Sequence, residues 1–209
     1  LRDNLEDLYL LTFLLLVLIL KYFFLYNFSE FNLIFFAIIS SISNIGIGLD
    51  AGVSNLSVFF LILTIIGGSS FSTTSGIKFI KIYILSKFSL EEIYLIVKPH
   101  FISNKKLFLS RYKIQDNEVK NCFLTIILFI ISFFILSAIL SIGGVNFQDS
   151  LSLSILTITN TVNSINYNLD NFNFVGLNMV AKISLMIFMI IGKVELLSLL
   201  ILIKKYLEK

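Results

Sequence analysis

The feature that most constrains this chain is an unbroken apolar run from residue 122 to residue 142. A helix needs about 20 apolar residues to cross the hydrocarbon core of a bilayer, so this run is long enough to span it. The runs 8–28 and 178–203 are also long enough, although both contain charged side chains. Four shorter runs are typical of re-entrant or broken helices. These shorter runs cover residues 31–42, 56–66, 77–85 and 151–158. The pattern predicts an all-α membrane protein.

Composition excludes several classes of protein. Hydrophobic residues make up 57% of the chain and charged residues 14%, whereas soluble domains average about 45–50% and about 25%. An ordinary soluble enzyme and a disordered chain are therefore excluded. One cysteine and one histidine leave no internal disulfide and too few ligands for a zinc site. A membrane enzyme is an alternative class, but no helix carries a nucleophile–base pair, so we expect no catalytic residues and no cofactor.

The distribution of charge predicts the topology. Nine of the 16 Lys and Arg residues lie between Lys78 and Lys120, whereas residues 28–55 and 143–178 contain none. By the positive-inside rule, the N-terminus of this chain, its 78–120 segment and its C-terminus are cytoplasmic, and the two cation-free stretches face outside. The net charge of +3 then reflects topology, so we expect a lipid bilayer and no nucleic acid as partner.

The two cation-free stretches resemble each other at a spacing of 120 residues. Residues 42–50 align with residues 162–170 through matching Ile, Leu and Asp residues. Both halves of the chain share one order: a long span, a short helix, a polar turn and a second span. This order predicts two helix–pore loop–helix repeats. Carbonyl oxygens of such a turn can replace the hydration shell of a monovalent cation. Ser43, Asn44, Ile45 and Gly46 have this chemistry, although a polar extracellular loop is an equally simple interpretation.

A second polar segment interrupts the apolar sequence at residues 67–76. Nine of its ten residues are small or hydroxylated: Gly67, Gly68, Ser69, Ser70, Ser72, Thr73, Thr74, Ser75 and Gly76. Irregular backbone at membrane depth must be buried in protein or line water. The segment therefore predicts a hinge or plug inside a pore. The alternative is a face of small residues for close helix packing.

Lys193 lies in the middle of the last apolar run, two residues before Glu195. Charges inside a membrane are costly and usually face a water path or a partner. We expect Lys193 to meet carbonyl groups of the 67–76 segment. In the alternative interpretation the run breaks near Gly192, and both charges lie close to the cytoplasmic interface.

Four segments together resemble the Trk/Ktr/HKT potassium transporter superfamily. Residues 67–78 resemble its G-G-x-x-x-S-T-x-G-G-I-K segment, and residues 189–195 resemble its M-x-x-G-R-x-E segment. Residues 98–100 and 115–119 resemble parts of its cytoplasmic connection. The resemblance implies a pore of four repeats, of which this chain would be the C-terminal half. The third repeat would cover residues 1–90, the connection residues 91–121 and the fourth repeat residues 122–209.

The same resemblance implies function and partners. Ser43 to Gly46 would form the third filter strand, the 67–76 segment would be a gate beneath the filter, and Lys193 would replace an arginine that holds this gate. Potassium ions at the filter would be the transported cargo. The implied partners are the N-terminal repeats of the same protein, a second copy in a homodimer and a cytosolic nucleotide-binding regulatory subunit. The implied location is the bacterial inner (plasma) membrane, as a multi-pass protein.

The fourth filter departs from the family pattern T-x-N-x-V-G-P-G. Its predicted ion-binding residues are Asn163, Ser164, Ile165 and Asn166. Asn166 and Asn168 stand at glycine positions, and Asn is the residue after Gly that best tolerates positive φ. The sequence thus predicts potassium uptake, with a sodium-permeable pore or a non-conducting membrane subunit as alternatives.

Overall fold

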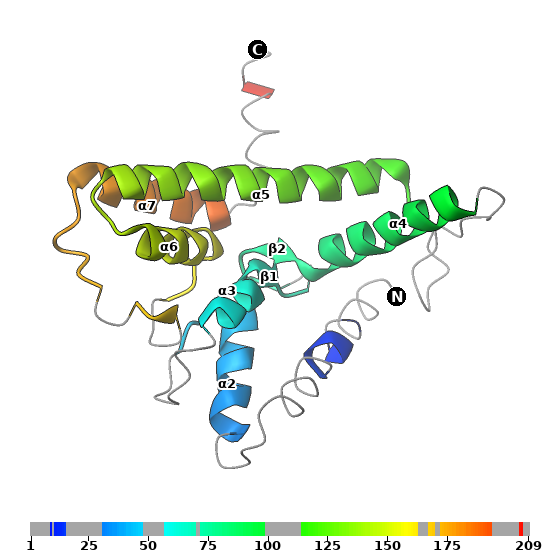
Figure 1. Ribbon diagram of the computed structural model, residues 1–209, viewed down its shortest axis with the longest axis horizontal. Coiled ribbons are helices and arrows are strands. Elements are labelled where there is room, and N and C mark those ends of the chain that lie inside the picture. The colour runs from blue at the N-terminus through cyan, green and yellow to red at the C-terminus, as the bar shows by residue number, and fades with distance from the viewer. Residues whose placement is uncertain are drawn as a thin grey trace.

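The structure is a computed structural model that describes residues 9, 11–15, 31–47, 57–69, 72–98, 114–162, 167–169, 172–193 and 205–206. The described part is mostly helical (Figure 1). Its elements follow in this order: α2 (Phe31–Ile42), α3 (Ser57–Ile65), β1 (Ile66–Gly67), β2 (Ile77–Lys78), α4 (Phe79–Val97), α5 (Asp116–Ile142), α6 (Phe147–Thr159) and α7 (Met179–Lys193).

The helix α5 contains the whole apolar run 122–142 and is the one described helix that is long and apolar enough to cross a membrane. It starts before the apolar run, at Asp116. The carboxylate of Glu118 accepts the backbone N–H of Gln115 at 3.3 Å, which supplies an acceptor to an otherwise unpaired donor at the helix start. The positive dipole end of the helix also favours Asp116 and Glu118 there.

The short apolar runs form helices close to the predicted bounds. The run 31–42 is α2, and the run 56–66 contains α3. The runs 77–85 and 151–158 extend further, as α4 to Val97 and as α6 from Phe147. The predicted boundaries after residues 90 and 121 fall inside α4 and α5, so the division of the chain into three parts stays a prediction.

The strands β1 and β2 are an exception to the expected all-helical fold. They pair in parallel, with Ile66 opposite Ile77 and Gly67 opposite Lys78. Each has only two residues. Because the pairing closes the ends of the 67–76 segment onto each other, this segment forms a closed loop between α3 and α4. We call residues 67–76 the gate loop.

One apolar core joins the two halves of the chain. It contains side chains from α2, α3, α5, α6 and α7. Its most buried members include Ile38, Phe60, Leu136, Leu140 and Ala181. In Figure 1, α6 and α7 lie along one end of α5, while α2, α3 and the two strands lie near the end of α6. The gate loop is therefore placed between elements of both halves.

Candidate functional site

The helices α2 and α6 end in the same way. Each is followed closely by an asparagine in the left-handed region, Asn44 with φ of 56° and Asn160 with φ of 52°. The amide N–H after each asparagine turns back to the helix: Ile45 bonds the Ser40 carbonyl at 3.0 Å. The corresponding bond in the second half joins Thr161 to the Leu156 carbonyl at 2.9 Å. Left-handed residues of this kind satisfy the last carbonyl groups of a helix.

Hydroxyl side chains near the ends of α2 and α6 also make matching hydrogen bonds. Ser43 Oγ donates to the carbonyl of Ile39 at 2.7 Å, four residues back. Thr159 Oγ1 donates in the same manner to Ile155 at 2.9 Å. The residues Ser41 and Thr157 make a second matching pair, with bonds of 2.8 and 2.6 Å to the carbonyls of Ala37 and Leu153. The two helix ends are therefore related by a spacing of 116 residues.

The spacing of 116 residues between the helix ends differs from the spacing of 120 residues that the sequence alignment gave. That alignment depended on Ile, Leu and Asp, which recur throughout this chain, whereas the helix end depends on hydroxyls and an asparagine. In the register of the helix ends, residues 43–46 correspond to residues 159–162. The predicted filter residues Asn163, Ser164, Ile165 and Asn166 lie outside the described residues, four positions further along. The sequence signal for the spacing of 116 residues is Ser-Ile-Ser-Asn at 41–44 and Thr-Ile-Thr-Asn at 157–160.

The stretches that follow the two helices touch each other. Gly46 has φ of +76°, and a Cβ added there would lie 2.2 Å from the carbonyl oxygen of Val162. Only glycine fits this approach, because a side chain would collide with backbone. The second stretch also returns to the first helix, since the hydroxyl of Tyr167 lies 3.2 Å from Ser41 Oγ. Tyr167 is fully buried.

The carbonyl groups of the gate loop face lysine ammonium groups. Lys78 Nζ donates to the carbonyls of Ser72 at 2.7 Å and Thr74 at 2.8 Å, and Lys78 is buried. Lys193 Nζ donates to the carbonyl between them, that of Thr73, at 3.2 Å. The contact expected between Lys193 and this loop is therefore present. Glu195 lies outside the described residues.

The loop is also braced internally. Thr74 Oγ1 accepts the backbone N–H of Gly68 at 2.9 Å, and it shares a short hydrogen bond with Ser72 Oγ. The backbone N–H of Ser72 donates to the Ser69 carbonyl at 3.0 Å. Of the predicted gate residues, Ser70 lies outside the described residues. The hydroxyls that the sequence singled out thus serve to shape the loop.

Both helix ends hold the gate loop at one residue, Ser75. Asn44 Nδ2 donates to the Ser75 carbonyl at 2.8 Å. Asn160 Nδ2 donates to Ser75 Oγ at 3.2 Å and to the Met189 carbonyl of α7 at 3.0 Å. Ser75 and Asn44 are buried. Asn160 is not among the residues that the sequence predicts for the site, because the spacing of 120 residues pairs Asn44 with another residue.

The helix α7 reaches the loop because Gly192 allows a close approach. A Cβ at Gly192 would lie 2.0 Å from the carbonyl oxygen of Ile158. Beside this contact lies a cavity of about 270 Å³, lined by Gly192, Lys193, Lys78 and loop residues from Ser72 to Gly76. The cavity contains two ammonium groups and no carboxylate among its described lining residues. Such a cavity repels free cations while both lysines are charged.

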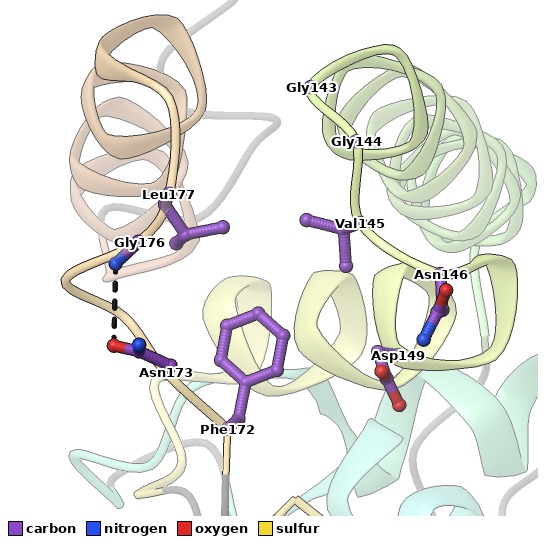
Figure 2. Close-up of a pocket in the computed structure, with 9 residues that line it drawn as sticks. All are labelled: Gly143, Gly144, Val145, Asn146, Asp149, Phe172, Asn173, Gly176 and Leu177. Carbon is purple, nitrogen blue, oxygen red and sulfur yellow. Dashed lines mark hydrogen bonds between the residues drawn. The ribbon is translucent and has the colours of Figure 1, made fainter.

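A second cavity lies at the turn between α5 and α6. Figure 2 shows it between this turn and residues 172–177. Its volume is about 300 Å³, and Asp149 is its one acidic lining residue among those described. Within the described ranges, no group of three or more His, Cys, Asp or Glu side chains could hold a metal ion.

The folded chain has the architecture of a membrane-transport protein of known structure. It is similar to the crystal structure of the potassium transporter TrkH from Vibrio parahaemolyticus, with a TM-score of 0.70 and 21% sequence identity. The match covers 96% of this chain and 43% of that chain, so this chain spans less than half of the transporter. No family model and no curated protein matches the sequence. The likeness shows that the two chains share a fold.

Proposed function

We propose that this chain is part of a potassium-uptake transporter resembling the Trk/Ktr/HKT superfamily. The observation that carries the proposal is the meeting of two matching helix ends on one loop, through Asn44, Asn160 and Ser75. A structural likeness to a potassium transporter supports the same function. In this proposal the chain forms two neighbouring quarters of a pore, and it catalyses no reaction.

The proposed mechanism begins at the ends of α2 and α6. The C-terminus of a helix carries a partial negative charge, which favours a cation. Backbone carbonyls that follow such an end can replace the water molecules around a potassium ion. Residues 43–46 form one such stretch, and the touching stretch after Asn160 forms the next. Positive φ at Asn44 and Gly46 allows successive carbonyl groups to point toward one axis, as a path lined by carbonyls requires.

The gate loop would control passage beneath these stretches. Its carbonyl groups already bind the ammonium groups of Lys78 and Lys193. A fixed positive charge opposes a permeating cation at close range. Conduction would therefore require the loop and its lysines to move away from the path together. Lysine holds the loop less rigidly than the arginine that the family pattern places there, because it lacks a planar fork of donors.

The surface of the helices supports a location in lipid. Large apolar side chains on α5 and α7 are exposed, such as Phe134 at 61% and Met179 at 73%. Water disfavours so much apolar surface, whereas lipid covers it at no cost. We propose a multi-pass protein of the bacterial inner membrane, with the N- and C-termini of this chain cytoplasmic. Two further repeats of the same protein, a second copy and a nucleotide-binding regulatory subunit would complete the assembly.

Growth of a bacterium that lacks potassium uptake tests this proposal. The full-length protein should restore growth on limiting potassium, and Gly46→Asp should abolish it because a Cβ cannot fit against Val162. The matched control is Gly144→Asp, since Gly144 also has positive φ but no atom lies within 4 Å of an added Cβ. Rescue that survives Gly46→Asp, at equal membrane abundance, would contradict the assignment of the filter.

A sodium-permeable or non-conducting subunit is the second candidate function. The observation that favours it is the presence of Val162 at the position that corresponds to Gly46. A valine cannot adopt the same backbone freely, so the two filter stretches differ in shape. Uptake of sodium in place of potassium, or neither, by a well-expressed protein would favour this alternative.

A further inference from the structure

We infer that Asn160 is the positioning residue that couples the end of α6 to the gate loop and to α7, with Ser75 as the shared attachment. Neither the sequence pattern nor the likeness to a transporter assigns this role to Asn160. The effect on ion flux rests on the proposed function, whereas the contacts themselves do not.

Asn160 uses both donors of its side-chain amide for this purpose. One hydrogen goes to Ser75 Oγ at 3.2 Å and the other to the Met189 carbonyl at 3.0 Å. An amide group has two N–H donors, so these two bonds use both of them. Three separate elements, namely α6, the gate loop and α7, are held by one side chain.

The backbone of Asn160 is fixed as well. Its N–H bonds the carbonyls at the end of α6, those of Leu156 and Thr157, and its φ of 52° closes the helix. The backbone of Asn160 therefore moves together with the end of α6. Because Gly192 packs against the Ile158 carbonyl, α7 follows the same displacement. Lys193 is the next residue on α7, so its bond to Thr73 shifts together with the bond to Ser75.

The two asparagines that bind Ser75 differ in burial, and therefore in how easily water can replace their hydrogen bonds. Asn44 is buried, and within the described part of the chain its Oδ1 has no hydrogen-bond partner. Breaking its bond to Ser75 would leave a second buried polar group unpaired, which is costly. Asn160 is only half-buried, so water can replace its partners. Asn44 is thus the fixed attachment and Asn160 the releasable one, and the loop is expected to pivot at Asn44.

Ser75 offers a clean way to separate the two attachments. Ser75→Ala removes the hydroxyl that Asn160 binds but keeps the backbone carbonyl that Asn44 binds. Asn160→Gly removes the amide but keeps a residue that accepts positive φ. In a double-mutant cycle, Asn160→Gly and Ser75→Ala should therefore be coupled, whereas Asn44→Gly and Ser75→Ala should be additive.

The experiment measures hydrogen–deuterium exchange of peptides that cover residues 67–78 in the full-length protein, in lipid nanodiscs. Asn160→Gly and Ser75→Ala should each speed exchange about threefold to tenfold, as expected for one lost hydrogen bond. The double variant should be no faster than the faster single variant, and Ser75→Thr, which keeps the hydroxyl, should restore slow exchange. Ser132→Ala is the matched control, because the Ser132 hydroxyl donates to the Phe129 carbonyl within α5.

Uptake of rubidium into proteoliposomes supplies a second readout. Release of the loop by Ser75→Ala should raise the maximal rate and leave the half-saturating concentration unchanged, because Ser75 lies in the gate loop and outside both filter stretches. Additive effects on exchange, or no effect of Asn160→Gly, would overturn the inference. If the unaltered protein carries no cation while the exchange coupling holds, the proposed function fails and the positioning role of Asn160 stands.

Discussion

The ends of α2 and α6 are alike up to their asparagines and different beyond them. Both helices place hydroxyls on carbonyls four residues back, and both close with a left-handed asparagine. After Asn44 the chain continues through Gly46, which is buried against backbone. After Asn160 it continues through Val162, which is 64% exposed. The end of a helix is encoded locally, so it can be duplicated, whereas the stretch beyond it depends on what packs there.

The two helix ends also attach to Ser75 in different ways. The first end is buried and attaches to the backbone of Ser75, whereas the second is half-buried and attaches to its side chain. A backbone attachment tolerates any residue at position 75, but a side-chain attachment requires a hydroxyl there. The second end is therefore the one that substitutions can release without unfolding the first.

The largest effect is expected from Gly46→Ala, because Gly46 makes the tightest contact between the two stretches that follow α2 and α6. Left-handed strain costs about 1–2 kcal/mol, and overpacking against the Val162 carbonyl adds about 1–3 kcal/mol. Uptake should fall at least tenfold. Gly144→Ala carries the strain alone, because its added Cβ meets nothing within 4 Å. Thermal unfolding and rubidium uptake of both variants check this, and equal losses in the two would argue against a close contact at Gly46.

Gly192→Ala should have the next largest effect, since it separates α7 from the end of α6. The added Cβ would lie 2.0 Å from the Ile158 carbonyl, which costs about 1–3 kcal/mol as overpacking. Better helix propensity offsets up to about 1 kcal/mol of this. Gly176→Ala is the control, because its nearest neighbour would lie at an ordinary 3.5 Å. Exchange of the gate loop should rise in Gly192→Ala alone; unchanged exchange there would mean that α7 does not hold the loop.

Lys193→Met tests the electrostatic attachment of the loop at the second end. The bond from Lys193 to the Thr73 carbonyl is solvent-exposed, so its contribution is discounted to about 0.5–1 kcal/mol. We expect loop exchange and maximal uptake to rise about twofold to fivefold. Lys182→Met is the control on the same helix, where the ammonium bonds the Val175 carbonyl at 2.8 Å. Lys193→Arg should keep the loop closed. Equal effects of Lys193→Met and Lys182→Met would mean that Lys193 does not hold the gate loop.

Tyr167→Phe should give the smallest effect, confined to stability. It removes the hydroxyl that meets Ser41, while Ser41 Oγ keeps its bond to the Ala37 carbonyl. With no buried group left unpaired, the loss should be about 0.5–1.5 kcal/mol and uptake should be unchanged. Thermal unfolding in detergent measures the loss. A strong decrease in uptake would instead place the Tyr167 hydroxyl on the ion path.

Several features could be predicted from the sequence, because they depend on local patterns. The apolar run 31–42 gave the bounds of α2, and the hydroxyl-rich segment 67–76 gave a loop between two apolar elements. The position of Lys193 near this loop followed from the cost of an isolated charge in an apolar run. These inferences needed only residue type and spacing.

Other features could not be predicted, because they depend on contacts between distant segments. The spacing of 116 residues between the two helix ends could not be predicted, since identities among Ile, Leu and Asp outweighed the asparagines that end the helices. The role of Asn160 requires α6, the gate loop and α7 to meet, which no local pattern shows. The parallel pairing of Ile66 with Ile77 likewise depends on how the loop closes.

The most direct test of the central claim is anomalous diffraction from crystals of the full-length protein in thallium, which replaces potassium in carbonyl sites. We expect an ion beside the carbonyl groups of residues 43–46, between the ends of α2 and α6 and above the gate loop. This site should be lost in Gly46→Ala and kept in Gly144→Ala. Thallium bound only elsewhere, with the region between the two helix ends empty, would contradict the account.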